Sequence, residues 1–114
     1  MDSQPTQFSS KWHLGEYVIQ RCDSHRVLLI DSTLVRFTPT EYELVTTLFE
    51  QSGKPVPFEQ LVHRAFHCEL DHDMRRLLDK HLDRIRSKLR PFSIGIYCIV
   101  RYGYILLSEK NTRI

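Results

Sequence analysis

The sequence predicts one α+β domain in which four short strands come first, three helices follow and a β-hairpin ends the fold. Strand-forming runs separated by turn residues fill the N-terminal part, and apolar residues at helical spacing fill the middle. Near the end, two β-branched and aromatic runs flank a glycine. The 114 residues, 41% of them hydrophobic, are enough for one modest core. We place this domain at 12–110, between flexible tails at 1–11 and 111–114.

The N-terminal strands are expected to form a four-stranded antiparallel sheet, because short turn-like segments such as Gly15-Glu16 and Asp31-Ser32 connect them. Successive short strands joined in this way pair with their neighbours in the chain. The predicted strands are Trp12–Leu14, Tyr17–Gln20, Arg26–Ile30 and Thr33–Phe37.

Two helices are expected next. Thr38 and Glu41 can cap each other's backbone amides, and Pro39 falls in the first turn, where a missing amide costs nothing. Gly53 is expected to end this helix. After a short extended link, the second helix is expected over about Phe58–Phe66.

The third and longest helix is expected over about Asp73–Arg90, before Pro91. Its exposed face carries three basic residues spaced four apart, and the opposite face carries an apolar stripe. The basic residues are Arg76, Lys80 and Arg84, and the stripe is Met74, Leu77, Leu78, Leu82, Ile85 and Leu89.

A hairpin of Ile94–Val100 and Tyr104–Ser108 is expected to close the fold. Gly103 is predicted to supply the positive φ that a tight turn needs. Arg101 and Tyr102 lie at the tip, where a projecting turn either reaches a neighbouring groove or phosphate or faces solvent.

The charge is distributed unevenly along the chain. Net charge is only +2, but residues 75–101 hold eight basic and two acidic residues, and residues 38–74 hold two basic and seven acidic ones. A concentrated basic stretch indicates either a surface for a polyanion or an ordinary solvated helix face. Asp79 and Asp83 interrupt the stretch; they either accept from cytosine amino groups or pair within the helix, and we favour pairing.

The sequence gives little support for an enzyme, a membrane protein or a secreted protein. The sequence has no GxSxG, GxxxxGK[ST] or HExxH motif and only four glycines, so we expect no enzyme activity, no cofactor and no small-molecule ligand. No apolar run approaches the roughly 18–20 residues of a membrane span. Three widely spaced cysteines and the lack of a signal-peptide pattern predict a cytoplasmic protein.

One group of residues raises the alternative of a metal site. His63, His67, Cys68 and His72 lie close together in the sequence, at the end of the second helix and in the loop after it. Structural zinc sites show cleaner paired spacing than this. We therefore expect polar residues of a helix end and loop, and no metal.

Three motifs resemble the OmpR/PhoB-type winged-helix effector domains. Residues 37–45 (FTPTEYELV) resemble the start of that family's first helix, and residues 76–89 (RLLDKHLDRIRSKL) resemble its recognition helix. Residues 100–104 (VRYGY) are similar to its wing. The resemblance covers about residues 12–108 and implies a winged helix-turn-helix fold that binds double-stranded DNA sequence-specifically and regulates transcription. Such domains are usually the C-terminal halves of two-component response regulators, and they often bind direct repeats as head-to-tail pairs.

The resemblance also implies roles for individual residues. Arg76 would hold a phosphate, and Leu77, Lys80 and Arg84 would face bases in the major groove. His81 would contact the DNA backbone, and Arg86 or Lys88 would support that contact. In the wing, Arg101, beside Tyr102, would contact the minor groove or a phosphate.

Several positions depart from the family pattern. Pro57 replaces the usual serine cap of the second helix, and Asp83 stands where a small or basic residue is common. Leu77 and Lys80 replace the usual threonine and valine, so the resemblance predicts no target sequence. Either one residue is deleted after Arg101, or Val100 occupies the position of the wing arginine.

The resemblance points to protein partners as well. The loop over Phe66–Asp73 matches a segment that meets RNA polymerase in some relatives, and its candidate residues are His67, Glu69, Asp71 and His72. The competing hypothesis is a protein-interaction module that keeps this fold and docks on a protein partner, for example RNA polymerase or another regulator, through the acidic 38–74 face and the 66–73 loop. Asp79, Asp83 and the altered base-facing positions leave room for this hypothesis.

Overall fold

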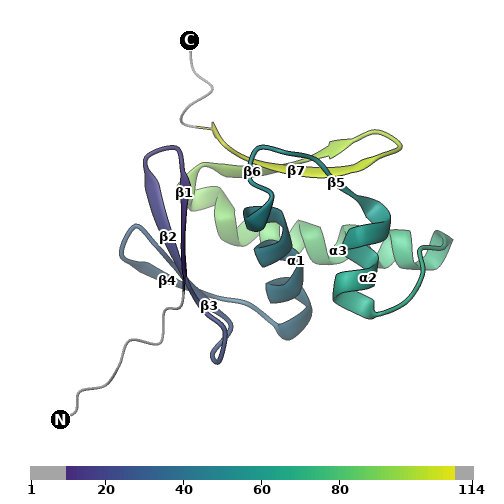
Figure 1. Cartoon of the computed structure of the whole chain (residues 1–114), viewed down its shortest axis with the longest axis horizontal. Helices are drawn as coiled ribbons and strands as arrows, with labels where there is room; N and C mark the ends of the chain where they lie inside the picture. The colour runs from purple at the N-terminus through teal and green to yellow at the C-terminus, as the bar shows by residue number, and fades with distance from the viewer. Residues whose placement is uncertain (1–9, 110–114) are drawn as a thin grey trace.

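The chain folds into an N-terminal sheet at one end, three helices in the middle and a second sheet along one side (Figure 1). A computed structural model describes residues 10–109. Residues 1–9 of the N-terminal tail expected at 1–11, and the C-terminal tail expected at 111–114, lie outside these residues. The predicted order of strands, helices and hairpin is confirmed.

Four antiparallel strands form the N-terminal sheet in the order β1-β2-β3-β4. They are β1 (Ser10–Leu14), β2 (Tyr17–Cys22), β3 (Val27–Ile30) and β4 (Thr33–Arg36). The first strand begins at Ser10, so Ser10 and Lys11, which were expected in the tail, instead belong to β1 and pair with Arg21 and Gln20. The turn between β3 and β4 is tight, and both Asp31 and Ser32 adopt positive φ there.

Helix α1 (Pro39–Glu50) begins as predicted. The Glu41 amide donates to Thr38 Oγ1 at 3.2 Å, and the Thr38 amide donates to Glu41 Oε1 at 3.0 Å, which completes the capping box. The helix ends earlier than expected, with Gln51 as its C-cap. Gly53, with φ +83°, lies in the turn that follows.

Helices α2 (Phe58–Phe66) and α3 (His72–Leu89) form the helix-turn-helix unit. Pro57 gives α2 no side-chain cap, and the Phe58 amide instead donates to the Tyr102 carbonyl at 2.9 Å. Asp71 caps α3 by accepting from the Met74 amide at 2.8 Å. The helix starts at His72, one residue before the predicted Asp73, and ends at Leu89, one residue before the predicted Arg90. The chain then continues as a 3-10 turn over Arg90–Phe92, which contains Pro91.

The second sheet contains β6 (Ile94–Ile99) and β7 (Gly103–Ser108), which form the predicted hairpin. A two-residue strand, β5 (Val56–Pro57), pairs with β7 and extends the hairpin to three strands. The sequence predicted this link as extended but gave no partner for it.

The expectation about Gly103 is wrong. The positive φ of the hairpin turn belongs to Arg101, at 66°. Gly103 is required for another reason: a Cβ at this position would lie 1.7 Å from the Val56 carbonyl oxygen. Backbone proximity between β5 and β7 therefore selects the glycine.

The core joins one face of the N-terminal sheet, the inner faces of the helices and the hairpin. Helix α3 contributes four of its six predicted apolar residues as fully buried side chains, while Met74 and Leu77 are half-buried. The fully buried large side chains are Phe49, Ile19, Leu28, Ile30, Leu44, Leu48, Leu61, Leu78, Leu82, Ile85, Leu89 and Leu106. Among the described residues, no helix combines the length and apolarity needed to cross a membrane.

Candidate nucleic-acid interface

Three basic side chains form one exposed strip on α3, and we call Arg76, Lys80 and Arg84 the basic strip. All three are exposed, and none forms an ion pair with another residue of the described range. The residues span two helical turns, about 12 Å by helix rise. Because the helix buries its other side, the strip is a rigid row of cations facing solvent.

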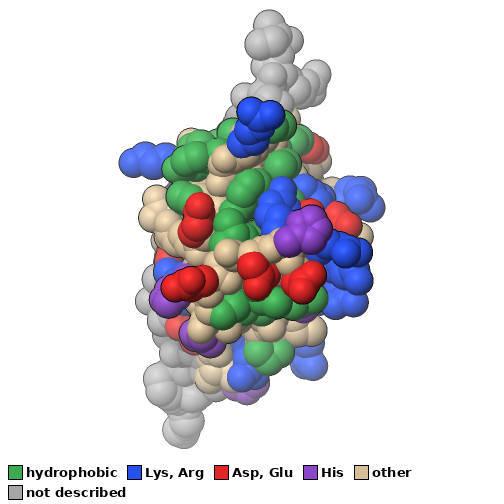
Figure 2. Space-filling view, turned by 90° about the vertical axis from the view of Figure 1, so that its right-hand side faces the viewer, with side chains coloured by type: hydrophobic (Ala, Val, Ile, Leu, Met, Phe, Trp, Pro, Cys, Tyr) green, Lys and Arg blue, Asp and Glu red, His purple; other side chains and the backbone are tan. Residues whose placement is uncertain are grey.

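The end of the molecule that holds the wing turn and the α2–α3 loop shows an uneven charge distribution (Figure 2). Lys and Arg side chains gather on one side of this face, and acidic side chains lie nearer its middle, with hydrophobic side chains between them. The charge asymmetry seen along the sequence is therefore also an asymmetry in space.

Two of the predicted DNA-contacting residues have partners inside the protein. Arg86 pairs with Asp83 at 2.7 Å and donates from Nε to the Ile96 carbonyl at 2.9 Å. Lys88 donates to Glu41 Oε1 at 2.7 Å and to the Arg36 carbonyl at 2.8 Å. Because these contacts occupy both cations, we leave Arg86 and Lys88 out of the candidate interface.

His81 also turns away from solvent. Its ring lies 5.6 Å from the ring of Phe66 on α2, and its Nδ1 is buried without a hydrogen-bond partner among residues 10–109. Burial lowers the pKa of His81, and the positive charge of Arg84 lowers it further, against an opposing effect of Glu41. A neutral, half-buried imidazole is a weak candidate for a phosphate contact.

Asp79 and Asp83 both pair within α3, as favoured from the sequence. Asp83 binds Arg86, and the Asp79 carboxylate accepts from Arg75, one turn earlier. Asp79 also accepts a hydrogen bond from the Tyr104 hydroxyl of β7, which the sequence did not predict. The spacing of Arg75 and Asp79 was visible as an i, i+4 pair, but only folding brings Tyr104 to it.

The wing turn projects exposed side chains beside the helices. Arg101 is exposed, Tyr102 is 46% exposed and Val100 is 80% exposed. Leu77 lies on the same α3 surface as the basic strip and lines a shallow hollow of about 270 Å³ with Arg76 and Lys80. Both cations and apolar groups are therefore available for contact.

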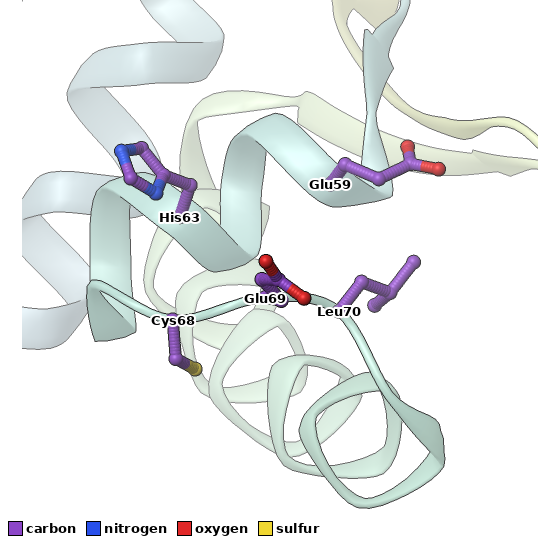
Figure 3. Close-up of a pocket in the computed structure, with 5 residues that line it drawn as sticks. All are labelled: Glu59, His63, Cys68, Glu69 and Leu70. Atoms are coloured by element: carbon purple, nitrogen blue, oxygen red, sulfur yellow. The ribbon is translucent and has the colours of Figure 1, made fainter.

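The α2–α3 loop forms a second surface feature. A hollow of about 420 Å³ is lined by Glu59 and His63 of α2 and by Cys68, Glu69 and Leu70 of the loop (Figure 3). Of the loop candidates, Asp71 is committed to capping α3, whereas His67, Glu69 and His72 are exposed. No three His, Cys, Asp or Glu side chains of the described range are grouped closely enough to hold a metal.

A helix-turn-helix with an exposed basic strip, followed by a hairpin wing and preceded by a four-stranded sheet, defines the winged-helix class. Residues 32–106 match the family described as "Transcriptional regulatory protein, C terminal". The chain belongs to this family, as an OmpR/PhoB-type winged-helix domain of transcriptional regulators.

Solved structures share the fold. The DNA-binding domain of CpxR from E. coli matches with a TM-score of 0.70 and 20% identity, over 89% of this chain and 99% of that one. The Klebsiella pneumoniae RstA DNA-binding domain, solved in complex with the RstA box, matches with a TM-score of 0.70 and 17% identity, over 88% and 99%. The DNA-binding domain of the response regulator AdeR, solved in complex with an intercistronic region, matches with a TM-score of 0.65 and 22% identity, over 79% of this chain and 94% of that one.

A curated relative is more similar in sequence. The transcriptional regulatory protein SrrA of Staphylococcus aureus is 41% identical over 71 residues. That alignment covers 62% of this chain and 29% of SrrA, so the chain corresponds to less than a third of the relative's length.

Proposed function

We propose that this domain binds double-stranded DNA sequence-specifically, with α3 in the major groove and the wing on the adjacent minor groove or backbone. The basic strip is the observation that carries the proposal. A row of cations that form no ion pair within residues 10–109, on a rigid helix whose opposite side is buried, fits a groove about 12 Å wide. The structures of relatives solved with DNA support the same use of the fold.

Each exposed residue has a distinct role in the proposal. Arg84 and Lys80 reach base edges, where arginine binds guanine O6 and N7 and lysine binds the same acceptors or a phosphate. Arg76, at the start of the strip, holds a phosphate. Leu77 contacts a thymine methyl group, and Arg101 and Tyr102 contact the DNA beyond the groove.

The partners and location expected from the resemblance remain part of the proposal. Head-to-tail pairs of the domain would occupy direct repeats, with half-sites about one helical turn apart. RNA polymerase would meet the α2–α3 loop through His67, Glu69 and His72, with Asp71 holding the start of α3. A regulator that binds chromosomal DNA in this way acts in the cytoplasm.

The test is a random-duplex selection on the purified chain, with the bound pools read at two salt concentrations. A recovered direct repeat is the expected result. Arg84→Ala should then cost about 1–3 kcal/mol and relax the preference at one base pair. Arg36→Ala is the matched control, because Arg36 is an exposed arginine on β4 of the N-terminal sheet.

A second candidate function is docking on a protein partner through the hollow of Figure 3, which the acidic Glu59 and Glu69 line. If the selection enriches no sequence and Arg84→Ala leaves binding unchanged, the groove assignment fails. Charge reversal of Glu59 and Glu69 would then be tested for loss of partner capture.

A further inference from the structure

We propose that Arg75, Asp79 and Tyr104 form a helix–wing clamp that fixes the wing against α3, so that helix and wing engage DNA as one rigid unit. These are positioning residues, because they act through Arg101 and Tyr102. This inference rests on the proposed function and goes beyond it by naming what sets the geometry between its two contact surfaces.

The clamp is centred on one carboxylate. Asp79 Oδ1 accepts from Arg75 Nη1 on the same helix and from the Tyr104 hydroxyl of β7. A carboxylate with two donors, one of them charged, makes hydrogen bonds stronger than neutral ones. It therefore joins α3 directly to the strand that leaves the wing turn.

The place of Tyr104 makes this joint effective. The residue is 3% exposed and lies in the central strand of the second sheet, opposite Val56 of β5 and Cys98 of β6. Tyr104 comes only two residues after Tyr102, at the tip of the wing turn. A shift of its side chain therefore moves the base of the wing.

Aromatic packing restrains the arginine of the clamp. The Arg75 guanidinium carbon lies 3.8 Å from the ring centroid of Phe58, the first residue of α2, and 5.6 Å from that of Tyr104. The Phe58 and Tyr104 rings meet edge to face at 5.7 Å. Stacking of this kind favours one arginine conformation and explains why Arg75, unlike its neighbour Arg76, faces inward.

A second connection holds the other side of the wing base. The Tyr102 carbonyl accepts from the Phe58 amide at 2.9 Å, and Gly103 lies against the backbone of Val56. The wing is therefore held from α2 and β5 on one side and from α3 on the other. These two connections restrain the base of the wing from opposite sides.

The phenol of the clamp keeps its proton across physiological pH. Burial and the hydrogen bond to Asp79 raise the pKa of Tyr104 to about 12. The phenol therefore remains protonated and continues to donate to the carboxylate.

The chain offers a matched pair of substitutions to test this. Tyr104→Phe removes one hydroxyl–carboxylate hydrogen bond and keeps the ring. Tyr42→Phe removes the same kind of bond, to Asp23 at 2.5 Å, but between α1 and the N-terminal sheet. Both proteins are compared with Arg101→Ala and with the double variant Tyr104→Phe/Arg101→Ala, after thermal unfolding has confirmed that each is folded.

The first readout is affinity for the duplex recovered by selection. Tyr104→Phe is expected to weaken binding about tenfold. In its background, Arg101→Ala should cost much less than in the wild type, because a wing that has lost its position no longer contributes. Tyr42→Phe should leave both the affinity and the cost of Arg101→Ala unchanged. Equal costs of Arg101→Ala in the two backgrounds would overturn the clamp.

The second readout needs no DNA. Heteronuclear NOE values of the Val100–Tyr102 amides should fall in Tyr104→Phe and remain at wild-type values in Tyr42→Phe. Unchanged values would overturn the clamp even if the chain binds no DNA. Conversely, a wild-type affinity in Arg84→Ala overturns the proposed function while the NOE comparison still decides the clamp.

Discussion

The Nζ atom of Lys88 lies 2.7 Å from Oε1 of Glu41, which is 2% exposed. The same ammonium donates to the Arg36 carbonyl at 2.8 Å. One side chain near the end of α3 therefore ties together the end of β4 and the capping box of α1. This contact links the N-terminal sheet to the helix that carries the basic strip.

Removing the cation from this contact should destabilise the fold. Lys88→Met leaves the buried Glu41 carboxylate without its charged donor, and we expect a loss of about 2 kcal/mol. Urea unfolding at pH 7 measures the loss. The double variant Lys88→Met/Glu41→Gln, which removes the uncompensated charge, should recover part of it, and no recovery would contradict this account.

The contact between Lys88 and Glu41 should also make the stability of the fold depend on pH. Burial alone would raise the pKa of Glu41, but hydrogen bonds from Lys88 and Thr38, together with nearby positive charge, outweigh it and lower the pKa below its usual 4.5. The contribution to stability is therefore complete above pH 4.5 and is lost as the pH falls through the folded-state pKa. Urea midpoints from pH 7 to pH 3 should fall more steeply for the wild type than for Glu41→Gln.

His81 should add a second acid-sensitive contribution at higher pH. Because its folded-state pKa is below 6.5, the unfolded chain binds the proton more readily, so stability is full above pH 6.5 and declines below it. His81→Leu removes the Nδ1 atom, which has no hydrogen-bond partner in the described part of the chain, and should flatten the dependence of stability on pH between pH 7 and pH 5. If the variant keeps the wild-type slope, another group is responsible.

Two lysines of α3 should affect DNA binding differently. Lys80→Gln should reduce the magnitude of the slope of log K against log salt by about 0.9, because an exposed cation of the basic strip no longer displaces a counterion. Lys88→Gln should leave the slope unchanged, since its charge is held by Glu41. Titrations at several salt concentrations, well below the unfolding midpoint of each variant, provide the comparison. Equal slope changes would place Lys88 in the interface.

Gly103 should tolerate no side chain. Gly103→Ala places a Cβ against the Val56 carbonyl, and we expect a loss of about 3 kcal/mol from overpacking. Gly53→Ala is the control: nothing lies within 4 Å of its Cβ, so it incurs only the strain of φ +83°. Thermal unfolding of both variants tests the difference, and a smaller loss at Gly103 would contradict the close approach.

Short-range features of the sequence predicted most of the fold. The capping residues Thr38 and Glu41 and the four-residue spacing of Arg76, Lys80 and Arg84 each act within one or two turns of chain. Because these preferences depend only on nearby residues, the sequence predicts them correctly. The family motifs implied the same order of elements and the same exposed side of α3, and the structure confirms both.

The partners of charged side chains could not be predicted in this way. Arg75 and Arg76 are neighbours in the sequence, yet about 100° of helix rotation separates them. Only the packing of Phe58 and Tyr104 decides which of the two arginines faces inward. Lys88 and Glu41 are 47 residues apart, and their contact exists only after α1 and α3 pack together.

The sequence by itself therefore determined the class of fold, the start of α1 and the position of the basic strip, because capping and helical periodicity are local. The tertiary structure alone decided which cations remain available, that β5 joins the hairpin, and that Gly103 serves close packing. These features depend on contacts between segments distant in the chain, and such contacts form only when the hydrophobic core brings those segments together.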